Sequence, residues 1–161
     1  MPGVRAATVA DVTRMAELAE QKRAEYATHT RVFHRPKAGA RETQELFFGV
    51  LVEDDEKVTL VHETDDGHVD AFLIAMLFPA PPVYDPGGLT CSVDDFTVES
   101  PELWKTAGVA LLKTAIGQTQ PRGAVQTAVV CGPRDQPKRD MLFAMGHQVA
   151  SEWFTLPFEQ P

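Results

Sequence analysis

Two neighbouring aspartates, Asp94 and Asp95, lie within the strand-like run "LTCSVDDFTVES". Neighbouring side chains of a strand point to opposite faces of the sheet, so only one of the two can face a given cleft. A carboxylate beside apolar residues such as Val93 and Phe96 has a raised pKa, and it can act as a general base or attract a cationic amine. The alternative is a solvated or loop-capping aspartate, which is the more common case for either residue taken alone.

A second candidate site follows in "KTAGVA", residues 105–110, where a run with helical spacing begins. Gly108 lies in its first turns, although a glycine in a helix costs about 1 kcal/mol relative to alanine. The start of a helix offers unpaired N–H groups and the positive end of its dipole, which together bind phosphate. Gly108 would let the phosphate approach and Lys105 would add charge; the alternative is that Gly108 serves close helix packing.

Cysteine and histidine offer weaker candidates. Cys131 and His147 are of nucleophile or acid–base type, but the sequence identifies no orienting partner for either, which favours a small buried thiol and an exposed or capping histidine. Cys91 begins one expected strand and Cys131 ends its parallel neighbour, so we expect no disulfide. No CxxC spacing or His/Cys cluster is present in the sequence, so we expect no metal.

Aromatic rings that could surround a cationic amine occur near the end of the first expected helix and in a proline-rich loop: Tyr26, His29, Phe33, His34 and Tyr84. Two of them have simpler explanations, since Tyr26 fits the apolar series of a helix and Phe33 can cover the core. A basic stretch in the same region is typical of a solvated loop: Arg31, Arg35, Lys37 and Arg41.

Hydrophobic periodicity predicts the elements that must position these residues. We expect strands at 3–8, 57–63, 68–78, 89–100, 123–131 and 147–158, and helices at 8–30, 42–54, 103–117 and 132–146. Thr8 and Asp11 form a possible capping box, and Asp66-Gly67 is a hairpin turn signal.

This order predicts an α+β fold with a mixed, mostly antiparallel central sheet and helices on both faces. The helix between strands 89–100 and 123–131 indicates that this pair is parallel. We expect a single domain spanning residues 1–161.

Two segments and the order of elements resemble the GCN5-related N-acetyltransferase family along nearly the whole chain. In that family a strand leads into Arg or Gln, two residues, Gly, one residue, and Gly or Ala; here "DFTVES" leads to "KTAGVA", with Lys105 at the first position. A later family segment has a polar residue, usually Asn, before a helix that ends near a glycine; Asp135 and Gly146 match it. Leu142 stands where the family's tyrosine acid is common, and His147 replaces a phenylalanine.

The resemblance implies an acetyl-CoA-dependent N-acetyltransferase that acts on a small-molecule or peptide amine by direct transfer in a ternary complex. It assigns the cofactor to a strand end, a helix start and one later residue: Phe96, Thr97, Val98, Lys105, Thr106, Ala107, Gly108, Val109, Ala110 and Asp135. Asp94 and Asp95 are the catalytic candidates, and Tyr26, His34 and Tyr84 are the candidates for the amine site. The alternatives are a non-catalytic acyl-CoA-binding or regulatory module of the same fold, and a structural or interaction domain.

The overall charge bears on the partners. With 15 basic and 23 acidic side chains the formal charge is -8, which argues against nucleic acid or an anionic membrane. The sequence lacks an apolar run of membrane-spanning length and the pattern of a signal peptide, so we expect a cytoplasmic protein. A homodimer is compatible with the resemblance.

Overall fold

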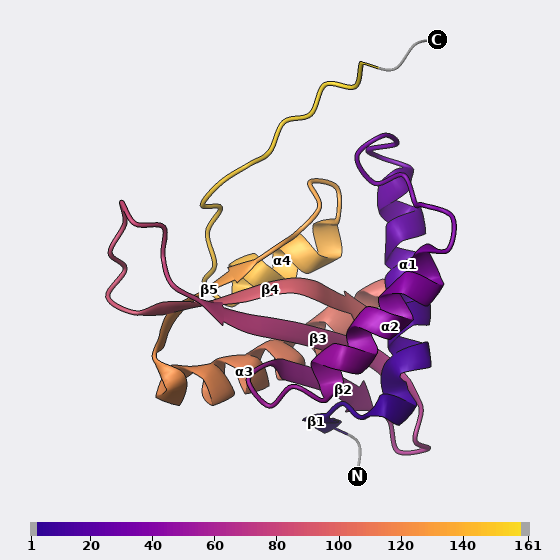
Figure 1. Cartoon of the computed structure of the whole chain (residues 1–161), viewed down its shortest axis with the longest axis horizontal. Coiled ribbons are helices and arrows are strands. Elements are labelled where there is room, and N and C mark those ends of the chain that lie inside the picture. Colours follow the sequence, from indigo (N-terminus) through magenta and orange to yellow (C-terminus); the bar gives the residue numbers. More distant parts are fainter. Residues whose placement is uncertain (1–2, 159–161) are drawn as a thin grey trace.

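The computed structural model describes residues 3–158 (Figure 1). Nine helices and strands of that range follow the order β1 (Gly3–Ala6), α1 (Val12–Ala27), α2 (Ala40–Val52), β2 (Val58–Glu63), β3 (Val69–Phe78), β4 (Leu89–Val98), α3 (Ala107–Thr119), β5 (Ala124–Val129) and α4 (Gln136–Ala144). Short 3-10 helices precede α1, precede α3 and follow α3: Val9–Asp11, Pro101–Lys105 and Gln120–Arg122.

The strands form one sheet in the order β1-β2-β3-β4-β5. The first three pairings are antiparallel, and β4 pairs with β5 in parallel. The predicted α+β architecture, with a mostly antiparallel sheet and one parallel pair, is therefore confirmed.

Helices cover both faces of the sheet because neighbouring residues of β3 point in opposite directions. Phe72 packs with Met15 of α1 and Phe48 of α2 in one core. Leu73 packs with Leu111 of α3 in the other core, which also takes in α4. The sheet is thus the middle of three layers (Figure 1).

Local turn and cap chemistry sets the element boundaries. The Thr8 N–H donates to the Asp11 carboxylate over 2.8 Å, which fixes the start of the first helical segment as predicted. Gly67 adopts a φ of +85° in the turn between β2 and β3, a conformation that favours glycine.

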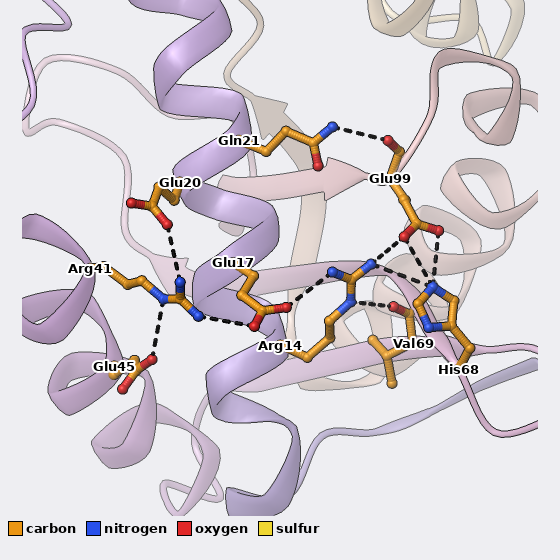
Figure 2. A network of polar contacts seen from close by, with 9 residues as sticks. All are labelled: Arg14, Glu17, Glu20, Gln21, Arg41, Glu45, His68, Val69 and Glu99. Atoms are coloured by element: carbon orange, nitrogen blue, oxygen red, sulfur yellow. Dashed lines mark hydrogen bonds and ion pairs between the residues drawn. The ribbon is translucent and has the colours of Figure 1, made fainter.

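A polar network around Arg14 ties α1 to the rest of the fold (Figure 2). Its Nε donates to the Val69 carbonyl over 2.9 Å, and its guanidinium pairs with Glu17 and Glu99. Glu99 also contacts His68 over 3.0 Å. Because Glu99 immediately follows β4, this network fixes the segment that leads to α3.

Two of the predicted elements differ most from the structure. The helix expected at 103–117 begins at Ala107, because the segment containing Pro101 forms a separate 3-10 helix first. The strand expected at 147–158 is wrong: the described residues 147–158 are extended but pair with no strand. Alternating apolar and polar residues mark a segment that can pair, but they do not identify the strand with which it pairs.

Candidate functional site

The parallel strands β4 and β5 separate halfway along β4. Val93 is the last β4 residue with a β5 partner, and its carbonyl accepts the Val130 N–H over 3.0 Å. Beyond this point β4 continues to Val98, whereas β5 ends at Val129. We call the region between β4 residues 94–98 and the segment 130–135 the wedge.

Backbone groups of β4 point into the wedge at alternate residues. The Glu99 N–H donates to the Asp70 carbonyl of the neighbouring chain segment over 2.7 Å. The antiparallel ladder alternates, so Thr97 also directs its N–H and C=O at β3, while those of Phe96 and Val98 point away from β3. Of the three backbone positions named from sequence, two therefore face away from β3.

Lys138 of α4 reaches into the wedge and is the residue that sequence reasoning missed. Its side chain is fully buried, and its Nζ donates to the Phe96 carbonyl over 3.0 Å. The ammonium lies 5.1 Å from the centre of the Phe96 ring and 5.2 Å from that of Trp104. Burial lowers the pKa of Lys138 to about 7, so this amine can give or take a proton near neutral pH.

The sequence did carry a signal for Lys138. The core residues Met141 and Leu142 and the partly buried Met145 follow it at intervals of three, four and seven residues. These intervals define the apolar face of a helix, so Lys138 lies on the face that packs into the core. A lysine at such a position is rarely buried without a partner.

The two aspartates differ in environment, as strand geometry required. Ile74 pairs with Asp95 and Ala75 with Val93, so Asp94 is the extra residue of a β-bulge and is exposed. Asp95 is half-buried on the side of α1 and α2, where Gln44 donates to its Oδ1 over 3.5 Å.

The charges of Asp95 and of Lys22 of α1 act on one another. Burial raises the pKa of Asp95, and the charge of Lys22 opposes that rise. Burial likewise lowers the pKa of Lys22, and Asp95 is the foremost charge that opposes it. The pair places a carboxylate and an amine, both closer to neutral titration than usual, beside the bulge.

Tyr26 borders the wedge on the side of α1. Its hydroxyl donates to Asp135 Oδ2 over 2.5 Å and accepts the Gly132 N–H over 3.1 Å. A Cβ on Gly132 would lie only 2.8 Å from the Tyr26 ring, so glycine is required there. Burial and the bond to Asp135 raise the pKa of Tyr26, so its hydroxyl stays protonated.

The predicted amine-site residues are divided between two places. His34 packs edge-on against Tyr26 with ring centres 5.3 Å apart. Tyr84 is exposed and instead lines a cavity of about 510 Å³ beside Thr90 and Ser92, in the half of β4 that pairs with β5. Tyr84 is therefore not brought to the wedge.

The start of α3 is exposed at Lys105 and Thr106 and partly exposed at Val109, whereas Ala107 and Gly108 are buried. A Cβ on Gly108 would meet Trp104 Cε3 at 2.8 Å. Close packing on Trp104 therefore explains this glycine, which is the alternative that the sequence had left open. A phosphate would meet the exposed residues of the turn.

Asp135, predicted to bind cofactor, is buried and bonded to Tyr26. Cys131 is half-buried beside it, with Sγ 3.7 Å from the Asp135 carbonyl, and burial raises the pKa of its thiol. Both Cys91 and Cys131 are free thiols, as expected. Leu142, at the position of the family's tyrosine, is a core residue.

Other chemistry is limited among residues 3–158. No group of three or more His, Cys, Asp or Glu side chains in that range is arranged to hold a metal ion. His147 Nε2 lies 2.8 Å from the Thr127 hydroxyl. This contact involves none of the wedge residues named above. Within the same range no helix combines the length and apolar character needed to cross a membrane.

Solved structures similar to this one cover nearly the whole chain. A mutant of the BH1408 protein from Bacillus halodurans matches with a TM-score of 0.83 and 16% identity, over 97% of this chain and 99% of that one. A predicted acetyltransferase from Clostridium acetobutylicum, solved with acetyl-CoA, gives 0.73 and 14%, over 98% and 96%. Glucosamine-6-phosphate N-acetyltransferase from Arabidopsis thaliana gives 0.67 and 16%, over 99% of each chain.

Sequence comparisons add no closer relative: no protein-family model matches the chain, and no curated protein sequence does. At identities of 14–16%, the structural likenesses establish the fold.

Proposed function

We propose that this chain, which has the fold of the GCN5-related N-acetyltransferases, transfers an acetyl group from acetyl-CoA to an amine. The observation that carries the proposal is the wedge, where β4 peptide groups that face away from β3 meet a buried lysine whose pKa is near neutral. The acetyl-CoA complex of the Clostridium acetobutylicum protein, whose fold this chain shares, supports acetyl-CoA as the donor.

Residues of this chain fit the two ends of acetyl-CoA. The Phe96 N–H and the Val98 peptide groups, which face away from β3, would bond the amides of the pantetheine arm and the acetyl carbonyl. At the start of α3, Lys105 and the exposed Thr106 would meet the pyrophosphate, helped by the positive end of the helix dipole. Bound acetyl-CoA supplies the activated thioester.

Asp95 and Lys138 divide the proton transfers in this mechanism. Asp95 accepts a proton from the incoming ammonium, so that the neutral amine nitrogen can form its bond to the acetyl carbon. Protonated Lys138 donates its proton to the sulfur as the carbon–sulfur bond breaks, and the second proton of the amine nitrogen leaves to solvent as the acetamide forms. Solvent returns the proton from Asp95 to Lys138, and a general acid or base of matched pKa contributes typically 10²–10⁴-fold.

The amine would approach from the α1 side of β4, where Asp95 is half-buried. Tyr26 and His34 lie on this side, and the aromatic edge they form suits a cationic group. The positive charge of Lys22 also acts on Asp95, so the site disfavours an acceptor that carries more than one cationic group. We therefore propose a small monoamine or a peptide N-terminus as the acceptor class.

A second candidate function is a non-catalytic acyl-CoA-binding module. The burial of Leu142 in the core favours it, because the family's usual acid is replaced by a side chain that cannot titrate. The two functions differ only in whether Lys138 and Asp95 perform proton transfer.

Amine-dependent release of free thiol from acetyl-CoA tests the proposal. Across a panel of primary amines we expect turnover by the wild type, a loss of at least tenfold in Asp95→Asn, and little change in the matched variant Asp94→Asn. Acetyl-CoA binding without turnover of any amine would assign the module instead. Equal effects of both aspartate variants would remove Asp95 as the base.

A further inference from the structure

The chain beyond α4 forms an apolar tail, which we define as residues 148–158. It carries four large hydrophobic side chains with high exposed fractions: Trp153 83%, Phe154 89%, Leu156 78% and Phe158 88%. Among the described residues, no backbone hydrogen bond joins the tail to the fold, and Trp153 has one ring contact, with Phe33 at 6.4 Å. Clustered apolar exposure of this kind marks an interaction segment.

The sheet has an open edge next to this tail. β5 is the last strand of the sheet, and Val125 at 52% and Val130 at 54% are strongly exposed. Because Val130 donates to β4, the N–H and C=O groups of Thr127 and Val129 point the other way, out of the edge. No Pro or charged residue protects β5, whose sequence is "AVQTAV".

We propose that the tail of a second copy of this chain adds to the free edge of β5 as a further strand, and that two copies exchange tails in a symmetric dimer. The tail is long enough, since residues 148–158 span roughly 36 Å at about 3.3 Å each and β5 spans about 20 Å. Phe154, Leu156 and Phe158 would lie on one face of the added strand, and Trp153 on the other.

The distribution of charge favours contact between copies through the tail and β5. Each chain has a net charge of -8, so two copies repel one another over most of their surfaces. β5 is uncharged and the tail contains only one charged residue, Glu152. The two surfaces that would meet are therefore the ones that add little repulsion.

The course of the tail favours exchange over pairing with its own β5. His147 lies beside β5 through its contact with Thr127, and the tail then runs away from the sheet (Figure 1).

Aromatic side chains bury about 150–250 Å² each, so the three aromatic residues would bury roughly 500 Å² per tail. Two tails and the surfaces that receive them approach roughly 2,000 Å², within the range of stable dimers.

Light scattering after size-exclusion chromatography gives the first test. We expect the wild type at twice the chain mass of 17.7 kDa, and a single-chain mass for a variant ending at His147 and for Phe154→Ser/Leu156→Ser. The matched control Val83→Ser, at a residue 82% exposed in the loop after β3, should remain dimeric. A monomeric wild type, or a dimer that survives loss of the tail, would overturn the proposal.

Complementation separates exchange from pairing within one chain. Val129→Pro removes an outward N–H from β5 and leaves a copy that can only donate a tail, while the variant ending at His147 can only receive one. Each should be monomeric alone, with a melting curve showing that it is folded, and their mixture should form a heterodimer. A mixture that stays monomeric refutes exchange between copies. These readouts are masses, so they are independent of acetyl transfer.

Discussion

Replacing Lys138 by Met should change how stability depends on pH. Its pKa lies at about 7 instead of 10.5, and each pKa unit corresponds to about 1.36 kcal/mol, so the fold disfavours the charged form by roughly 5 kcal/mol. Lys138→Met removes that penalty but leaves the Phe96 carbonyl without its donor, at a cost of about 1–3 kcal/mol. At pH 6 the variant should therefore be more stable than the wild type by roughly 2–4 kcal/mol.

The advantage of the variant should shrink as the pH rises. Below pH 7 the lysine is protonated in both the folded and the unfolded chain, so the full penalty applies. Above pH 7 the folded chain loses this proton while the unfolded chain keeps it until about pH 10.5, so wild-type stability rises with pH. Between pH 7 and pH 9 the wild type should gain about 2 kcal/mol relative to Lys138→Met.

Urea unfolding at pH 6, 7, 8 and 9, followed by the fluorescence of buried Trp104, measures both free energies of unfolding. Lys113→Met, which replaces an exposed lysine of α3, is the matched control and should follow the wild type at every pH. Parallel profiles for the wild type and Lys138→Met would refute a neutral-range amine in the wedge, and with it the acid role of Lys138.

Three further substitutions test packing and polar contacts in the fold. Gly108→Ala should destabilise the fold by about 1–3 kcal/mol in thermal or urea unfolding, since its Cβ would lie 2.8 Å from the Trp104 ring; unchanged stability would return the glycine to a ligand role. Tyr26→Phe should cost about 1–3 kcal/mol by leaving Asp135 without its donor, and an indifferent variant would mean that this bond is absent in solution. The bond from Arg5 depresses the pKa of Asp11, so this carboxylate stabilises the fold above about pH 4 and loses that effect as the pH falls; Asp11→Asn should therefore show a weaker loss of stability between pH 4 and 2, and equal acid losses would contradict the assignment.

The elements of the fold could be predicted because their determinants are local. The contact of Thr8 with Asp11, the turn at Gly67 and the apolar run of β3 each depend on residues close in sequence. The parallel pairing of β4 with β5 followed from the helix between them.

The site could be predicted only in outline because its contacts are distant in sequence. Tyr26 bonds to Asp135, which is 109 positions away in the sequence. No local pattern shows this bond, so the sequence assigned Tyr26 to the amine site and Asp135 to the cofactor. Gly108 lies only four positions after Trp104, but the sequence does not show where the Trp104 ring lies. The position of that ring distinguishes close packing from phosphate binding as the reason for the glycine. Alternation after His147 likewise marks a strand-forming segment without saying which strand it pairs with.

The thermal melting temperature with and without acetyl-CoA tests the central claim, that the wedge and the start of α3 bind this cofactor. A ligand at 100 times its Kd stabilises the native state by about 2.7 kcal/mol, which for a domain of this size corresponds to a rise of roughly 5–10 °C. We predict such a rise, saturating with acetyl-CoA concentration. A melting temperature unchanged at millimolar acetyl-CoA would contradict both the transferase and the binding-module proposals.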